Sequence, residues 1–90
     1  MGLLALNMPN PKHTMSRHTQ QLSNNETFAY GYDHPLQEYF FQYFDGAQNL
    51  IREGAGASSV LLNEIESLGR KMFPMNHIMD IAMDLPVRDS

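Results

Sequence analysis

The sequence predicts an α+β protein with a small antiparallel sheet of two or three strands, two helices packed on one face of it, and a flexible N-terminal tail. Three observations support this prediction. Aromatic residues alternate with small or polar ones over residues 28–33, and apolar residues recur with helical spacing over residues 59–69 and 76–85. Over residues 7–27 apolar residues are sparse. Ninety residues fit one domain, which we place at residues 28–90.

The N-terminal segment, residues 1–27, is predicted to be a disordered tail. Residues 7–27 are dense in Asn, Ser, Thr, Gln and Pro and offer few apolar side chains for burial. Ordering such a segment costs roughly 1–2 kcal/mol per residue in backbone entropy, with little burial in return. The alternative is that Leu3, Leu4 and Leu6 dock as a short anchor.

Residues 28–33 are predicted to form a strand with one aromatic face. Phe28, Tyr30 and Tyr32 occur at every second position, which is the period of a strand. Between them, Gly31 leaves room on the opposite face for a neighbouring backbone. The Asp-His-Pro-Leu stretch that follows is expected to end the strand, because proline fixes its own φ and biases the preceding residue toward an extended conformation.

Residues 36–45 fit either a helix or a strand. A helix would gather Phe40, Tyr43 and Phe44 on one face. A strand is favoured by the density of aromatic residues, and the Asp-Gly pair that follows is typical of a hairpin turn into a second strand over residues 47–53. We favour the strand because a run with so many aromatic side chains suits a pleated surface better than a helix.

The strand interpretation separates the aromatic residues into two rows. Tyr39, Phe41 and Tyr43 then point to the face opposite Phe40 and Phe44. Helices on one side of a small sheet bury only one of its faces. We assign Phe40 and Phe44 to the core and expect the other row to be exposed as an interface.

Two helices are predicted after a flexible Gly-Ala-Gly-Ala-Ser-Ser joint. The first, over residues 59–69, has Ser58 or Ser59 as its N-cap and ends at a glycine. The second, over residues 76–85, begins with Asn76 as its N-cap and is ended by a proline. Their apolar stripes consist of Leu61, Leu62, Ile65 and Leu68 in the first and Ile78, Ile81, Ala82 and Leu85 in the second.

Composition and charge exclude several activities. The chain has no cysteine, which excludes disulfides, thiolate chemistry and the common structural zinc sites. Its formal charge is −4, and residues 28–90 carry four bases against nine acids. A domain without a basic stripe is not suited to direct contact with nucleic acid or with an anionic membrane. No segment approaches 18 consecutive apolar residues, so we expect a cytoplasmic protein without a transmembrane helix.

No motif of an enzyme or of a metal site is apparent. The glycine-rich joint lacks the lysine of a phosphate-binding loop. His77, Asp80 and Asp84 could share one face of a helix and hold a divalent metal ion. We interpret the two acids instead as the solvated side of the helix and His77 as part of its N-terminal turn. Asp33 and His34 are adjacent in the chain and therefore cannot readily orient each other for acid–base chemistry. We predict no catalytic, cofactor-binding or metal-binding residues.

Tyrosine and methionine point instead to protein binding, since both are common at interfaces that must fit irregular shapes. Four tyrosines lie in the aromatic stretch of residues 28–46, and three methionines repeat every four residues from Met75, just before the second predicted helix, to Met83 within it. The alternative is that both sets form the core, because a small protein needs its large apolar side chains for burial. The interface candidates are Glu38, Tyr39, Phe41, Tyr43, Asp45, Met75, Met79 and Met83.

The leading hypothesis is a small non-enzymatic protein-binding module that acts by occupying a surface, with a foreign protein or a second copy as its partner. In format, as a short, acidic, cysteine-free chain, it is similar to many accessory proteins of phages and mobile elements. Some of those proteins inhibit host nuclease complexes by covering a basic groove. This similarity implies a second hypothesis, an inhibitor whose acidic surface pairs with such a groove. A small enzyme or metal-binding protein is the remaining alternative.

Overall fold

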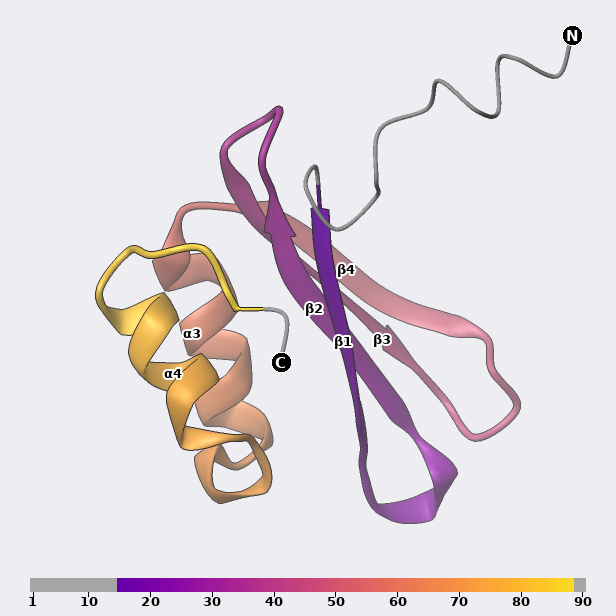
Figure 1. The fold of residues 1–90 in the computed structure, drawn as a ribbon. Coiled ribbons are helices and arrows are strands. Elements are labelled where there is room, and N and C mark those ends of the chain that lie inside the picture. The colour runs from indigo at the N-terminus through magenta and orange to yellow at the C-terminus, as the bar shows by residue number, and fades with distance from the viewer. Residues whose placement is uncertain (1–14, 89–90) are drawn as a thin grey trace, which may run out of the picture.

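The computed structural model describes residues 15–88. It is an α+β structure in which a four-stranded antiparallel sheet is followed by two helices on one of its sides (Figure 1). The predicted fold class is confirmed, but the sheet has four strands rather than the two or three expected. The strands are β1 (Met15–Gln21), β2 (Thr27–Asp33), β3 (Glu38–Phe44) and β4 (Leu50–Gly56); the helices are α3 (Ser58–Leu68) and α4 (Met75–Ala82), with short 3-10 turns η1 (Ser23–Asn25) and η2 (Arg70–Met72).

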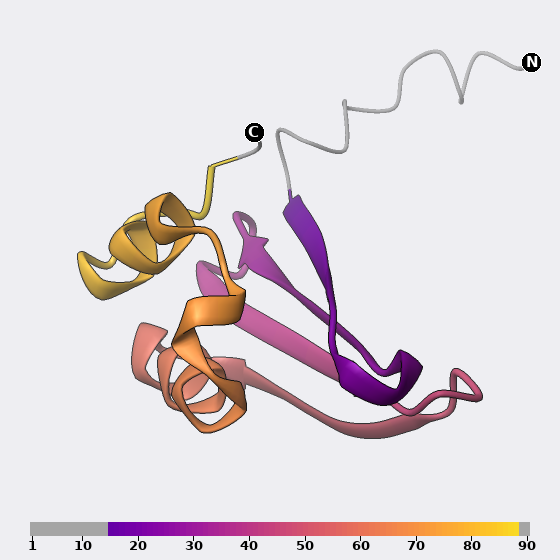
Figure 2. The same cartoon turned by 90° about the horizontal axis from the view of Figure 1, so that it is seen from below.

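The strands are paired in the order in which they occur in the chain, β1-β2-β3-β4. Figure 2 shows both helices on the same side of this curved sheet, which leaves the other side open. The strand interpretation of residues 36–45 is confirmed over Glu38–Phe44, and a hairpin does follow it. Its second strand is Leu50–Gly56 rather than residues 47–53, after a turn of five residues. The glycine-rich segment predicted to be a flexible joint is therefore mostly the end of β4 and the start of α3, and that prediction is wrong. Asp45 stabilises the hairpin turn because its Oδ1 accepts hydrogen bonds from the N–H groups of Ala47 and Asn49, both at 2.9 Å.

Strand β1 lies within the segment predicted to be a tail, so that prediction is wrong for residues 15–27. An edge strand satisfies its backbone through the ladder to its neighbour and needs few apolar side chains of its own. Ser16 is buried, and its hydroxyl accepts a hydrogen bond from the N–H of Tyr32 at 3.1 Å. Residues 1–14, which include the leucines considered as an alternative anchor, lie outside the described residues.

Gly31 allows β1 to approach β2 closely. A Cβ atom at this position would lie 1.9 Å from the carbonyl oxygen of Ser16, which no side chain can tolerate. The expectation that Gly31 leaves room for a neighbouring backbone is therefore confirmed.

The core lies between the sheet and the helices, and it contains the aromatic row that was expected to be exposed. Tyr39 and Phe41 are each only 5% exposed, while Phe40 and Phe44 are half-buried on the open side. The assignment of the two rows is therefore wrong. The core residues from sheet and helices are Leu22, Phe28, Tyr30, Tyr39, Phe41, Leu61, Ile65, Phe73, Ile78, Ile81 and Val87.

The pairing register explains this inversion. Residues directly opposite each other in an antiparallel pair share a face of the sheet. Tyr30 of β2 pairs with Phe41 of β3, and Tyr32 pairs with Tyr39. The aromatic face of β2 therefore continues into the odd-numbered aromatic residues of β3, and both lie under the helices.

Helix α3 follows its predicted apolar stripe, with Leu61 and Ile65 fully buried. Its N-cap is Ala57 rather than a serine, and no side chain caps it. Gly69 ends the helix at φ +119, where its N–H donates to the carbonyl of Ile65 at 2.9 Å.

Helix α4 is shorter than predicted. It begins after Pro74, which takes the N-cap position expected for Asn76, and it ends at Ala82. Ala82 and Leu85, which the predicted stripe placed in the core, are both exposed, and Leu85 lies beyond the helix. Among residues 15–88, no helix combines the length and the apolar character that a membrane crossing requires.

Candidate functional site

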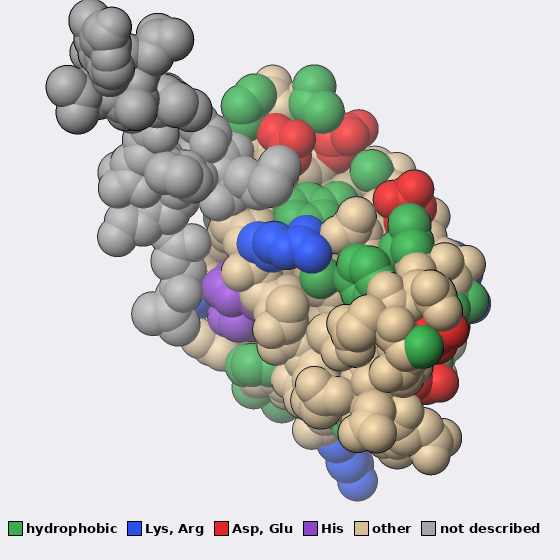
Figure 3. Space-filling view, turned by 90° about the vertical axis from the view of Figure 1, so that its right-hand side faces the viewer, with side chains coloured by type: hydrophobic (Ala, Val, Ile, Leu, Met, Phe, Trp, Pro, Cys, Tyr) green, Lys and Arg blue, Asp and Glu red, His purple; other side chains and the backbone are tan. Residues whose placement is uncertain are grey.

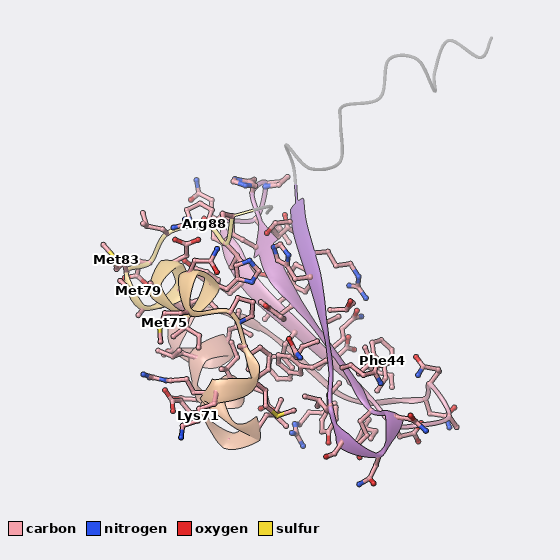
Figure 4. The ribbon with its side chains drawn as sticks, turned by 60° about the horizontal axis from the view of Figure 1, so that its bottom comes forward. Phe44, Lys71, Met75, Met79, Met83 and Arg88 are labelled. Carbon is pink, nitrogen blue, oxygen red and sulfur yellow. The ribbon has the colours of Figure 1, made fainter. Side chains whose placement is uncertain are left out.

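The outer side of α4 carries a row of exposed methionines. Met75, Met79 and Met83 are 63%, 50% and 62% exposed, although a typical large apolar side chain gains from burial. Figure 4 shows them in a line along the side of α4 that faces away from the sheet. We call this row the methionine surface.

The position of this row follows from the residues that α4 buries. Ile78 and Ile81 pack into the core, and His77 and Asp80 are also turned inward. The methionines at i, i+4 and i+8 occupy the opposite side of the helix. Their interface role was predicted, and their exposure is compatible with it.

The side of the sheet away from the helices is a second candidate surface. One cross-strand row there contains Arg17, Gly31, Phe40 and Ala55, which are direct partners across all four strands. Phe40 and Ala55 stand beside a hollow of about 510 Å³. The side chains around the hollow include Arg17, Asp33, Leu36, Glu38, Phe40, Gln42, Glu53 and Ala55. We call this region the open-face hollow.

The open-face hollow is apolar at its centre and acidic around it. Asp33, Glu38 and Glu53 outnumber Arg17, which gives a formal net charge of −2. Within residues 15–88 the salt bridges all lie elsewhere, so none of these four groups is paired in one. Figure 3, which looks onto this side of the molecule, shows apolar side chains with acidic and basic ones around them.

A buried polar cluster joins β1, β2 and α4. The hydroxyl of Tyr30 lies 2.7 Å from Nδ1 of His77, and the ring centroid of His18 lies 4.3 Å from that of His77. Burial lowers the pKa of His77, and the neighbouring His18 lowers it further, whereas burial raises the pKa of Tyr30 to about 12. His18 Nε2 is buried and has no hydrogen-bond partner within residues 15–88.

The residues considered as metal ligands do not converge. His77 is turned toward Tyr30, the carboxylate of Asp80 accepts hydrogen bonds from Arg88, and Asp84 is exposed and bonded to Ser58. The described part of the chain contains no group of three histidine or acidic side chains placed to hold a metal ion.

The other predicted interface residues have structural roles. Tyr39 donates a hydrogen bond to the carbonyl of Leu85 at 2.5 Å, and burial, with a smaller contribution from Asp84, raises its pKa to about 12. Phe41 is part of the core. Their burial is incompatible with the exposed row that we expected.

Tyr43 and Asp45 are half-buried and engaged within the chain. The Tyr43 hydroxyl donates to Glu26 at 2.8 Å, and the guanidinium of Arg52 lies 5.1 Å from the centre of its ring. The hydrogen bond to Glu26 raises the pKa of Tyr43. Backbone hydrogen bonds, above all from Asn49, lower the pKa of the Asp45 carboxyl. Glu38 alone among the polar candidates reaches the open-face hollow.

Phe40, Arg17 and Glu53 were not among the predicted site residues. The length of the turn between β2 and β3 could have predicted on which side of the sheet Phe40 lies. If Asp33 and Glu38 close a four-residue turn as partners, counting back along the strands pairs Gly31 with Phe40. The open side then contains the even-numbered residues of β3.

The comparison of this chain with protein-family models, curated proteins and solved structures found no match. The class that its fold and its surfaces define is that of a small α+β protein with a four-stranded meander. Two helices cover one side of its sheet, and the methionine surface and the open-face hollow lie on opposite sides of the molecule.

Proposed function

We propose that this protein is a small non-enzymatic binding module that acts by occupying a surface of a protein partner, with the methionine surface as its contact. The observation that carries this proposal is the exposure of Met75, Met79 and Met83, each at least half open to solvent on one side of one helix. Burying such a row in a complex would remove apolar area from water, at about 25 cal/mol per Å².

The chemistry of the row supports a protein as the partner. Methionine is unbranched and polarizable, so that its side chain adapts to an irregular apolar surface. Anchors repeating along one helix are the arrangement with which a helix enters an apolar groove. The partner is either a foreign protein or a second copy of this chain, which the row could meet across a two-fold axis.

The test replaces Met75, Met79 and Met83 together with glutamine, which keeps the length of the side chains and removes their apolar character. The matched control replaces the exposed Leu50 and Ile51 with glutamine in the β3–β4 hairpin. Light scattering is measured over a range of protein concentrations and at two salt concentrations.

If the wild type dimerises, the dimer should be lost in the methionine variant and retained in the control. If the wild type is monomeric, photo-crosslinked partners should be captured by the wild type and the control but not by the methionine variant. Equal association by all three proteins would contradict the proposal.

A second candidate function is supported by the unpaired acids around the open-face hollow. Glu38 and Glu53 could pair with arginine or lysine on a nucleic-acid-binding protein and so cover its basic groove. Association through these acids should weaken as salt rises and should be lost in Glu38→Gln/Glu53→Gln. An association that depends on the methionines and is insensitive to salt would exclude this alternative.

A further inference from the structure

The open-face hollow lies where the described chain begins. Strand β1 starts at Met15, whose direct partner on β2 is Asp33, and Asp33 is one of the residues around the hollow. Arg17, two residues further along β1, is another. Residues 1–14 therefore join the described structure at the rim of the hollow.

The composition of residues 1–14 complements this surface. Leu3, Leu4 and Leu6 form an apolar run, and Lys12 is basic, while the segment contains no acid. The hollow offers the matching groups, with an apolar centre at Phe40 and a formal net charge of −2 around it. An apolar and cationic segment is thus attached directly beside an apolar and acidic surface.

The distances allow the segment to cross this surface. Neighbouring strands lie about 4.8 Å apart, so the path from β1 to β4 is roughly 14 Å. Lys12 is three residues from β1, which gives it a reach of about 10 Å, sufficient for Asp33 or Glu38. Leu6 is nine residues away and can reach about 30 Å, well beyond β4.

We propose that residues 1–14 bind in the open-face hollow of their own chain, with the leucines against Phe40 and Ala55 and Lys12 beside the acids. A tethered segment binds at an effective concentration in the millimolar range, so that a weak contact suffices. This favours the chain's own segment over a free cationic peptide. The proposal does not rest on the methionine surface, which lies on the other side of the molecule, and either proposal can fail without the other.

The absence of cysteine makes a direct test possible. A single cysteine introduced by Ala5→Cys in the full chain can carry a nitroxide spin label, and amide relaxation is compared between its paramagnetic and reduced forms. We expect strong broadening of the amide signals of Gln42 and Ala55 on the open side, and little broadening at Met79 on α4.

The matched control carries the same label together with Leu3→Ser, Leu4→Ser and Leu6→Ser. Broadening at Gln42 and Ala55 should then fall to the level seen at Met79. The variant Phe40→Ala should reduce the broadening as well, whereas Met79→Gln should leave it unchanged. Broadening that persists in the triple-serine variant would overturn the proposal, because the tether alone would then explain it.

A mixture of spin-labelled chain with isotope-labelled, cysteine-free chain identifies the source of the segment. Broadening only within one chain supports the proposal. Broadening of the same amides in the mixture would show that the segment of a second copy occupies the hollow, and it would overturn binding within one chain. Equal weak broadening over both sides of the molecule would overturn it too.

Discussion

The hydroxyl of Tyr30 and Nδ1 of His77 are hydrogen-bonded at 2.7 Å, and this contact joins the centre of the sheet to α4 across 47 residues of sequence. Both side chains are buried. Burial and the nearby His18 lower the pKa of His77, which favours its neutral ring, and a neutral ring has one nitrogen that donates a hydrogen bond and one that accepts. The position of α4, and with it that of the methionine surface, depends in part on this one contact.

Replacing Tyr30 with phenylalanine should destabilise the protein by about 1–3 kcal/mol, because the buried Nδ1 of His77 is left without a partner. The free energy of unfolding is measured by urea denaturation. The control is Tyr32→Phe, which removes a hydroxyl from a half-buried ring in the same row. An equal loss in both variants would show that the contact with His77 contributes nothing specific.

Lowering the pH from 7 to 5 should reduce the free energy of unfolding. The folded ring of His77 has a lowered pKa, so the unfolded state takes up a proton near pH 6.5 while the folded state resists it. The unfolded state then binds more protons, and stability falls as the pH falls through this window. In His77→Gln the free energy of unfolding should depend less on pH between 7 and 5. A pH dependence equal to that of the wild type would contradict its assignment to His77.

The C-terminal end of the described chain is held by the ion pair between Arg88 and the buried Asp80. The carboxylate of Asp80 accepts hydrogen bonds from Nε and Nη2 of Arg88 at 2.9 and 2.8 Å, and these bonds lower its pKa. The pair therefore stabilises the fold above the ordinary pKa of aspartate, about 3.9, and its contribution is lost as the pH falls through the lowered pKa.

Replacing Arg88 with alanine should accordingly lower the melting temperature at pH 7, and the difference from the wild type should shrink as the pH falls below about 4. The control is Arg70→Ala, whose partner Glu66 is exposed. Exposed pairs contribute little, so this variant should melt close to the wild type at every pH. A constant difference for Arg88→Ala down to pH 2 would contradict the role of Asp80.

The two neighbouring phenylalanines of β3 should respond very differently to truncation. Phe41→Ala removes a core ring and should cost about 3–5 kcal/mol. Phe40→Ala removes a half-buried ring from the open side and should cost about 1–2 kcal/mol. Urea denaturation of both variants tests which side of the sheet the helices cover. A larger loss for Phe40→Ala would mean that the register of β2 and β3 is different.

Local sequence patterns were sufficient to predict the existence of β2, α3 and α4, although not the N-caps of the two helices. Leu61 and Ile65 stand one turn apart and are both buried, and Gly69 ends α3 as its position suggests. In such elements the burial pattern and the local backbone preferences agree, so that one stretch of sequence contains the information.

Strand β1 could not be found in the same way. Its stabilisation comes from backbone hydrogen bonds to β2, and the side chains that it turns toward the core side include Ser16 and His18, which no apolar pattern distinguishes from a loop. The ring of His18 packs against those of Tyr30 and His77. Because His77 lies much further along the chain, the sequence around β1 does not reveal this contact.

The candidate surfaces were predictable to different degrees. The spacing of Met75, Met79 and Met83 indicated a row on one helix, although it did not show whether that row is buried. The two aromatic rows of β3 were separated correctly but assigned to the wrong sides. Period two defines two faces without identifying the buried one, and the hairpin register is needed to decide.

The order of the strands has a consequence for how the protein folds. Each strand pairs with its neighbour in the chain, and the turns between β1, β2, β3 and β4 contain five, four and five residues. Short loops cost little entropy to close, and a meander with such local pairing is expected to form quickly. The contacts between α4 and the sheet span far more of the chain, so we expect them to be made late in folding and to break first in partial unfolding. A partner that binds α4 would then increase the kinetic stability of the protein, because it would slow the first step of unfolding.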